Sequence, residues 1–290
     1  MAIHTPVHDS GHLLGEGARR LRARKPQHTG DAVPSVETIR RVGQPQTIRG
    51  RATAEHWSAQ LYWRRVSPYL TQRFLAMGLS ADTVTVGVIV TGWMAALALF
   101  IPSIAGPLLA AVFAQLQMLV DASDGEVARV RGTSGPRGVF LDKIAHYTTE
   151  GGIPIALGAS LAITMGDPLP LALGALLGSM VLMNKVLNDA VHVARSKSGM
   201  KSVPDSVEAR EISRPLLRLA RQAFNVIPLH RIYHSVEMTQ VILVAAIVQA
   251  LVDAPVLWWT LIALVIVTPL VLAGHFVAIL ASPKLRPAAH

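Results

Sequence analysis

Residues 121–146 read DASDGEVARVRGTSGPRGVFLDKIAH and place three carboxylates and one histidine beside apolar sequence. Asp121 and Asp124 are three residues apart, and Asp142 and His146 are four residues apart. On a helix, residues at these spacings project from one face. Two such faces, joined by a short basic turn, would form a cup for divalent cations, because hard cations prefer carboxylate oxygens.

The same carboxylates also have a simpler interpretation as partners in ion pairs at the helix ends. Arg129, Arg131 and Lys143 are close enough in sequence to supply the positive charges. Ionisable groups inside a membrane are costly, however, and by default they mark a functional cavity. We therefore expect the four groups to serve a site, with structural ion pairs as the alternative.

The composition around this stretch is that of an integral membrane protein. Of 290 residues, 51% are hydrophobic and only 16% are charged. The net charge of +9 comes from basic residues that avoid the segments expected outside the membrane. Such a distribution is the positive-inside bias of membrane proteins. Because the bias accounts for the positive charge, we expect no nucleic-acid partner. Cysteine is absent, which excludes disulfides, thiolate metal sites and a cysteine nucleophile.

The apolar segments predict an all-α, polytopic membrane protein. A span needs roughly 20 apolar residues. Six segments of the predicted membrane domain, residues 79–282, have this length, at about 80–101, 106–128, 138–163, 169–193, 235–253 and 256–281. An even number of transmembrane helices returns both termini to the cytoplasm. Residues 196–234 would then form a cytoplasmic connector with a short amphipathic helix near 207–224, and residues 283–290 a cytoplasmic tail.

Two further segments precede the first span. Residues 1–52 are polar and lack an apolar period, which predicts a flexible cytoplasmic extension. Its arginine clusters could contact anionic lipid or have no specific partner. Residues 53–78 alternate apolar and basic side chains at helical spacing, which predicts a juxtamembrane amphipathic helix in the interface. Pro68 is expected to bend or break this helix.

The stretch around Asp121 resembles the signature of the CDP-alcohol phosphotransferases, also called CDP-alcohol phosphatidyltransferases. That signature reads D-x-x-D-G-x-x-A-R, about eight residues, and then G-x-x-x-D-x-x-x-D. Seven of its eight defined positions are matched at the right spacing: Asp121, Asp124, Gly125, Ala128, Arg129, Gly138 and Asp142. The departure is His146, which stands where the family has its fourth aspartate.

The resemblance implies a membrane enzyme that moves a phosphatidyl or phosphoalcohol group from a CDP-linked donor to an alcohol and releases CMP. It implies that Asp121, Asp124 and Asp142, with His146 in the fourth position, hold Mg²⁺ or Mn²⁺, normally two ions. It also implies that the CDP moiety contacts Gly125, Ala128, Arg129 and Gly138. Members of the family act in phospholipid biosynthesis and typically form homodimers.

His146 admits three interpretations. A neutral imidazole is a competent general base for an alcohol, so His146 could do the work of the missing aspartate. Glu150 follows four residues later on the same helical stripe and could orient the ring, as a catalytic partner. Alternatively, His146 is a metal ligand, which would favour Mn²⁺ over Mg²⁺, and the base lies elsewhere. In the third interpretation the histidine marks lost catalysis.

Weaker features resemble other parts of the family pattern. Asp82 and Thr85 lie where the family opens its first span with S-P-N-x-x-T, and they could contact the cytidine or ribose. An N-cap and a backbone-bonded threonine explain them equally well. Arg137 and Arg195 resemble basic positions that receive the phosphate of an acceptor in some members, although interfacial arginines are an alternative.

The fourth predicted span carries polar and small residues at helical spacing. Its polar face is expected to look into the cavity, with hydrogen bonds between helices as the alternative, and comprises Asn184, Lys185, Asn188, Asp189 and His192. Its GALLGS stretch, residues 174–179, and the last two spans could support close helix contact in a homodimer.

Two classes of function follow. The first is a transferase of the inner (plasma) membrane with its active site and both termini in the cytoplasm. Its donor would be CDP-diacylglycerol, or a CDP-activated polar alcohol with a lipid or soluble acceptor. The second is a membrane protein on the same scaffold that binds CDP-linked donors without turnover. Release of CMP in the presence of Mg²⁺ or Mn²⁺ distinguishes them.

Overall fold

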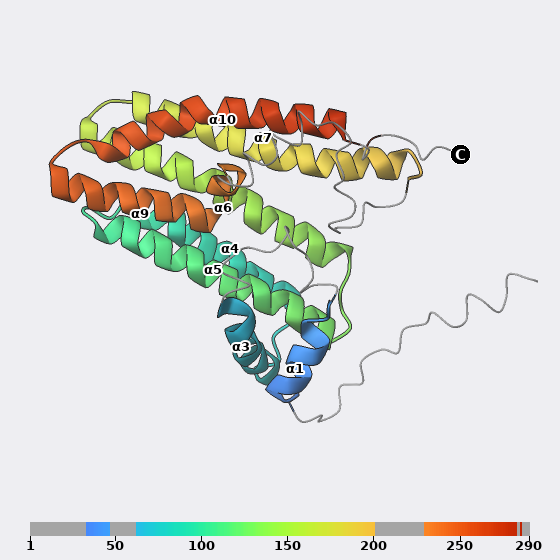
Figure 1. Ribbon diagram of the computed structural model, residues 1–290. Helices are drawn as coiled ribbons and strands as arrows, with labels where there is room; N and C mark the ends of the chain where they lie inside the picture. The colour runs from blue at the N-terminus through green and yellow to red at the C-terminus, as the bar shows by residue number, and fades with distance from the viewer. Residues whose placement is uncertain (1–32, 47–61, 201–228, 283–284, 286–290) are drawn as a thin grey trace, which may run out of the picture. The chain divides into compact units, whose positions relative to one another are not determined.

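The computed structural model describes residues 33–46, 62–200, 229–282 and 285, and every regular element in these ranges is a helix (Figure 1). In chain order they are α1 (Val36–Gly43), α3 (Arg64–Ala76), α4 (Ala81–Ala98), α5 (Ala105–Val130), α6 (Pro136–Met165), α7 (Leu169–Lys197), the 3₁₀-helix η3 (Leu229–Tyr233), α9 (Ser235–Val252) and α10 (Val256–Ala281). The predicted all-α fold is confirmed.

Among the described residues, five helices are long and apolar enough to cross a membrane, namely α4, α5, α7, α9 and α10. With its 30 residues, α6 is also long enough, but ionisable residues in its first half lower its hydropathy. Counted with α6, the set is compatible with the predicted six spans. The largest difference in boundaries is at the end of α7, predicted at 193 and observed at Lys197.

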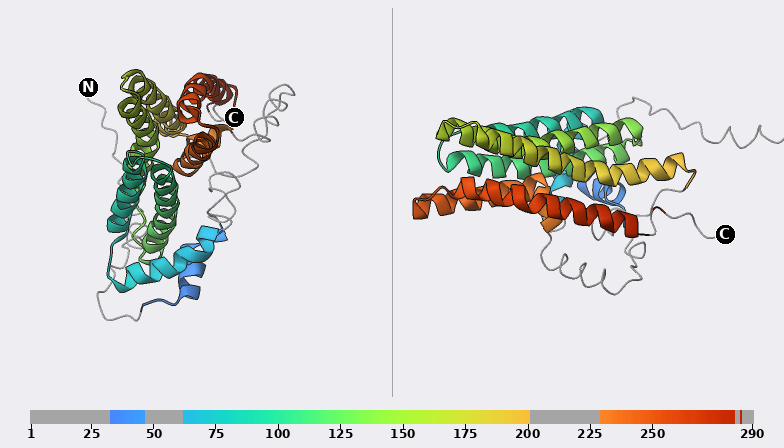
Figure 2. Two further views of the ribbon diagram at one scale, coloured as in Figure 1. Left: turned by 90° about the vertical axis from the view of Figure 1, so that its left-hand side faces the viewer. Right: turned by 90° about the horizontal axis from the view of Figure 1, so that it is seen from above.

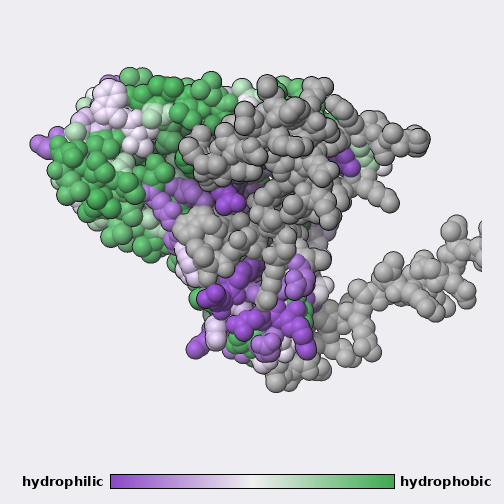
Figure 3. Space-filling model, in the orientation of Figure 1, coloured by the Kyte–Doolittle hydropathy of each residue, from purple (hydrophilic) through white to green (hydrophobic). Residues whose placement is uncertain are grey.

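The surface agrees with a multi-pass membrane protein. Large apolar side chains such as Trp93, Ile163 and Leu270 are exposed on the outside of the bundle. Apolar residues dominate the left-hand part of the bundle in Figure 3, whereas hydrophilic residues gather around α1 and α3 and in a smaller patch on the bundle. Outward apolar side chains are expected where lipid replaces water as the solvent.

The helices of the bundle run side by side (Figure 2). α4 packs against both α5 and α6, α7 packs against α6 and α10, and α9 contacts α5 and α10. A buried apolar cluster joins the last four helices through residues that include Ile153, Leu177, Ile242 and Leu261. α5 ends at Val130 and α6 begins at Pro136, and this short connection places their polar ends at the same end of the bundle.

Local sequence signals set the helix ends. The Ser80 side chain accepts a hydrogen bond from the Thr83 amide and caps the N-terminus of α4. Pro136 occupies the first turn of α6, where its missing N–H is not needed. Gly166 ends α6 in the left-handed region, with φ of 66°, which glycine adopts without strain. Pro136 and Gly166 thus fix where α6 begins and ends, and with it the position of its polar first half along the bundle.

Glycines bring α6 and α7 into backbone contact. A β-carbon at Gly174 would lie 2.5 Å from the carbonyl oxygen of Pro154, and one at Gly158 would lie 2.8 Å from the Cα of Gly174. At Gly178 it would lie 2.7 Å from the carbonyl oxygen of Gly151. The glycines of the 174–179 stretch, which the sequence suggested for a homodimer, therefore face another helix of the same chain.

The segment before the first span differs in part from expectation. Residues 1–52 were predicted to be a flexible extension, yet α1 lies within them, capped by Ser35 and packed against α5 and α3. The order comes from contacts distant in sequence, described below. The rest of this prediction falls on residues 1–32 and 47–52, outside the described residues.

The predicted juxtamembrane and connector helices are described only in part. α3 forms the end of the predicted 53–78 helix, and it runs through Pro68 without a break. Residues 53–61 and the helix expected at 207–224 lie outside the described residues.

Candidate active site

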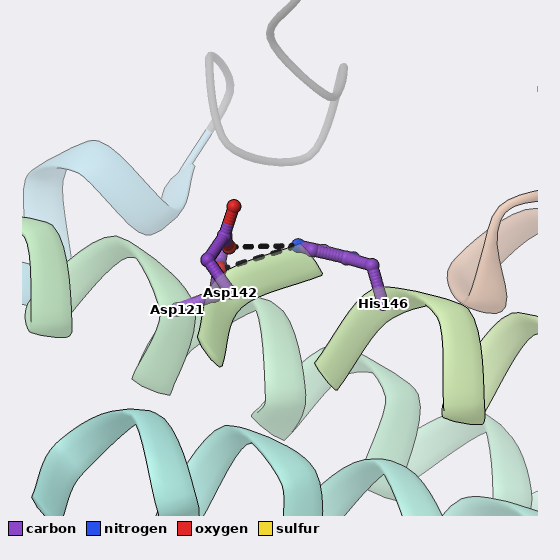
Figure 4. A group of neighbouring side chains, drawn as sticks. All are labelled: Asp121, Asp142 and His146. Atoms are coloured by element: carbon purple, nitrogen blue, oxygen red, sulfur yellow. Dashed lines mark ion pairs between the residues drawn. The ribbon is translucent and has the colours of Figure 1, made fainter. Parts of the chain in front are cut away.

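Three of the predicted site residues converge on one point. The Nε2 atom of His146 lies 3.3 Å from Oδ1 of Asp121 and 3.4 Å from Oδ1 of Asp142. Asp121 comes from the second half of α5, and the other two come from the first three turns of α6. Figure 4 shows the three side chains pointing toward one another. The structure thus brings together three of the four residues that the sequence placed on facing helix stripes.

This group has the donors of a divalent-cation site. One ligand atom from each residue lies within 4.8 Å of the other two. The side chains are 23%, 41% and 25% exposed in chain order, so solutes can reach them. Two carboxylate oxygens suit Mg²⁺ and Mn²⁺, and the imidazole nitrogen suits Mn²⁺ better than Mg²⁺. The residues therefore fit one divalent cation.

Asp124 lies beside this group but is not one of the three converging ligands. It is near enough to Asp121 and Asp142 for their charges to act on it. Its Oδ2 atom accepts a hydrogen bond of 2.7 Å from the Thr85 hydroxyl of α4. Thr85 was expected to touch either the nucleotide or its own backbone, and its hydroxyl does bond to the Ala81 carbonyl oxygen at 3.1 Å. Its bond to Asp124 in addition connects α4 to the second aspartate.

Gly125 makes room for the side chain of Arg129. A β-carbon at Gly125 would lie 2.9 Å from Nη1 of Arg129 and 3.1 Å from Nη2. The Arg129 Nε atom donates a hydrogen bond of 2.5 Å to the carbonyl oxygen of Gly43 at the end of α1. The family resemblance implies that Gly125 contacts the CDP moiety, and the structure adds that the absence of a side chain here leaves room for Arg129.

Behind His146 lies a buried charge network centred on Glu150. The Nδ1 atom of His146 lies 3.5 Å from Oε1 of Glu150, whose side chain is 1% exposed. The other carboxylate oxygen of Glu150 pairs with Nζ of Lys185 at 2.6 Å. His234, which directly follows η3, places Nδ1 3.4 Å from Oε1 of Glu150 and 3.3 Å from the Lys185 amine. Opposite charges thus accompany the buried carboxylate, as burial requires.

Sequence reasoning anticipated part of this network. The spacing from His146 to Glu150 predicted their contact, and Lys185 belonged to the face expected to look into the cavity. His234 was not predicted, because it reaches Glu150 from a distant helix start and no periodicity marks it. Its position after the connector was the only available signal.

Another polar group fastens α6 to α7. Lys143 pairs with Asp189 at 2.9 Å, and the Tyr147 hydroxyl donates to the same carboxylate. The polar face of α7 was expected to look into the cavity or to form hydrogen bonds between helices. Asp189 follows the second alternative. Asn184 also forms such a bond, of 2.6 Å, with His275 of α10.

The remaining predicted contacts are spread around the group. Asp82 and Arg137, predicted to bind different ligands, form an ion pair of 2.8 Å that joins the starts of α4 and α6. Gly138 lies in the first turn of α6, and a β-carbon there would meet nothing within 4 Å. Ala128 is half-buried in the last turn of α5, and Arg195 is half-buried in the last turn of α7. Roles in binding for these residues stay predictions.

Comparison with known families bears on the same region. Residues 79–204 match the family model described as CDP-alcohol phosphatidyltransferase. The matched residues comprise α4 to α7 and hold all three converging side chains, whereas α1, α3, α9 and α10 lie outside the match. No curated protein matches the chain.

Proposed function

Residues 79–204 of this chain form a CDP-alcohol phosphatidyltransferase domain, and on that premise we propose that the protein moves a phosphatidyl or phosphoalcohol group from a CDP-linked donor to an alcohol. The observation that carries this proposal is the convergence of Asp121, Asp142 and His146 on one point. CDP-diacylglycerol is the first donor to test, because the protein is a multi-pass membrane protein and its substrates are then lipids or reach it at the lipid surface.

The proposed reaction exchanges the phosphoanhydride bond of the donor for a new phosphoester bond. The acceptor oxygen forms a bond to the phosphorus of the transferred group, the pyrophosphate bond to CMP breaks, and the hydroxyl proton passes to a base. A divalent cation held by Asp121, Asp142 and neighbouring groups would neutralise negative charge on the phosphates and on the departing CMP. Two ions, with Asp124 as a further ligand, remain the expectation from the family resemblance.

His146 is the proposed base. Nδ1 faces Oε1 of Glu150 at 3.5 Å, and with the ring proton on Nδ1 the Nε2 lone pair serves as the base. The same geometry also suits a metal ligand, because Nε2 lies almost equally far from Asp121 and Asp142. The two roles predict different consequences of substitution, which are given in the Discussion.

The remaining substrate contacts are proposed from the family pattern. Gly125, Ala128, Arg129 and Gly138 would line the CDP site with Asp82 and Thr85, and Arg137 and Arg195 would receive a phosphate on the acceptor. Support for the nucleotide site comes from the position of Arg129 beside Gly125. We place the protein in the inner membrane with this site and both termini in the cytoplasm, and a homodimer remains a prediction from the resemblance.

Product identification tests the proposal. The full chain, purified and reconstituted in lipid, is given radiolabelled CDP-diacylglycerol, Mg²⁺ or Mn²⁺, and a panel of alcohols and their phosphates. The proposal expects CMP and one new labelled lipid, both absent with Asp121→Asn. Binding of the donor without CMP release from any acceptor in the panel would favour the alternative, a donor-binding protein without turnover.

A further inference from the structure

Helix α1, which lies outside the family match, is attached to α5 through a fully buried glutamate. Glu126 directly follows Gly125 but points to the opposite side of α5 from the aspartates. Its carboxylate accepts hydrogen bonds from Nε2 of Gln44 at 2.8 Å, from Ser67 at 2.5 Å and from Thr71 at 2.7 Å. A buried carboxylate with three donors is a strong and specific anchor, since loss of a donor leaves its charge undersatisfied.

Gln44 at the end of α1 also satisfies a carbonyl group that α3 leaves open. Pro68 has no N–H, so the carbonyl oxygen of Arg64, four residues earlier, loses its usual helical partner. Nε2 of Gln44 donates to that oxygen at 2.7 Å. The proline inside α3 thus frees the carbonyl oxygen to which Gln44 donates. This one hydrogen bond replaces the helical bond that α3 lacks and holds the end of α1 in place.

The docked end of α1 contacts a residue of the signature motif. The backbone of Gly43 packs so closely on Glu126 that a β-carbon there would lie 3.1 Å from its Cγ. The Gly43 carbonyl oxygen, at the negative end of the helix, accepts the 2.5 Å bond from Nε of Arg129. With Nε fixed, the two terminal nitrogens of Arg129 lie beside Gly125. They are therefore presented on the motif side of α5.

We propose that α1 is a positioning element for the donor-nucleotide site. Gln44 and Glu126 dock the helix, and the Gly43 carbonyl orients the Arg129 guanidinium over Gly125 to receive a phosphate of CDP. This inference rests on the proposed function, in which Arg129 lines the CDP site. It adds residues outside the family match to the machinery that binds the donor.

The test measures binding of CDP, in the presence of Mn²⁺, to the full chain in detergent. Gln44→Met keeps the volume of the side chain and removes the donor. The control Glu37→Gln alters only an exposed ion pair with Arg40 on the same helix. Loss of one positioning hydrogen bond is expected to raise the Kd for CDP by about threefold to tenfold in Gln44→Met. The control is expected to bind CDP like the wild type.

A double-mutant cycle separates positioning from general destabilisation. Arg129→Lys removes the Nε donor, so the proposal expects Gln44→Met to weaken CDP binding in the wild type but not further in the Arg129→Lys background. Additive effects, or unchanged affinity in Gln44→Met, would overturn the role of α1 and leave the proposed function standing. Absence of CDP binding by the wild type would overturn the proposed function, and the role of α1 with it.

A second variant keeps the test decisive if Gln44→Met yields too little folded protein. Gly43→Ala forces α1 away from Glu126 by a few tenths of an ångström without removing a polar group. It is expected to weaken CDP binding in the same direction and, again, not additively with Arg129→Lys.

Discussion

The Nδ1 atom of His146 lies 3.5 Å from Oε1 of Glu150, one turn further along α6. Because Glu150 is in turn paired with Lys185, the imidazole is held from behind while Nε2 faces the aspartates. The single departure from the family signature is therefore built into a supported arrangement.

Substitution of His146 tests its role as the base. His146→Ala is expected to lower turnover by about 100-fold to 10,000-fold, the usual contribution of general base catalysis. His146→Asp restores the family signature and is expected to keep most of the activity. Both are measured as CMP release with saturating donor and Mn²⁺. Full turnover by the alanine variant would show that His146 is not the base.

The alternative role of His146 as a metal ligand can be tested by spectroscopy. If Nε2 ligates the ion, the pulsed electron paramagnetic resonance spectrum of bound Mn²⁺ contains a nitrogen coupling that disappears in His146→Asp. If His146 is only the base, the wild-type spectrum shows no such coupling. The measurement needs no turnover and so remains informative if the alternative interpretation, loss of catalysis, is correct.

The carboxylates of the converging group are expected to dominate cation binding. Asp142→Asn should weaken Mn²⁺ binding at least about 10-fold, because it replaces a charged ligand by a neutral one. The matched control is Asp189→Asn, which removes a carboxylate that pairs with Lys143 instead of the group. Titration of Mn²⁺ against each purified variant checks this. Equal losses of Mn²⁺ affinity in both variants would show that any nearby negative charge supports cation binding and that Asp142 is not a specific ligand.

The ion pair between Glu150 and Lys185 is expected to matter for stability as well as for His146. Glu150→Gln leaves a largely buried ammonium without its counter-ion, and breaking a buried pair in this way typically costs about 3–5 kcal/mol. The double variant Glu150→Gln with Lys185→Met should recover much of this loss, because neither charge remains. Thermal unfolding in one detergent provides the comparison. A double variant less stable than both single variants would contradict the assignment.

Backbone contact between α6 and α7 predicts a strong preference for glycine. Gly174→Ala should destabilise the protein by about 1–3 kcal/mol, because its β-carbon would meet the backbone of α6 and neither helix can yield without moving. Gly152→Ala in α6 is the control, since its β-carbon would make only an ordinary contact of 4.0 Å with Ala96. Similar melting temperatures for the two variants would show that the helices separate easily.

Much of the fold followed from sequence because membrane spans are long, apolar and locally encoded. The facing stripes of α5 and α6 followed in the same way, since helical spacing fixes which side chains share a face. Helix α1 was not predicted. Its apolar residues do recur at helical spacing after the Ser35 cap, but a helix of eight residues is too short to be stable alone, and its order depends on Gln44 reaching Glu126. The contact of His234 with Glu150, and the use of Gly174 within the chain, likewise depend on tertiary packing.

The most direct test of the central claim is the cation dependence of CDP binding. The claim is that the carboxylates of α5 and α6 hold a divalent ion that binds the cytidine pyrophosphate. CDP is titrated against the purified full chain with Mn²⁺ and with a chelator, in the wild type and in Asp121→Asn. We expect CDP to bind only when the wild type holds Mn²⁺, and to be lost in Asp121→Asn. Equal affinity with the chelator, or in the variant, would contradict the account.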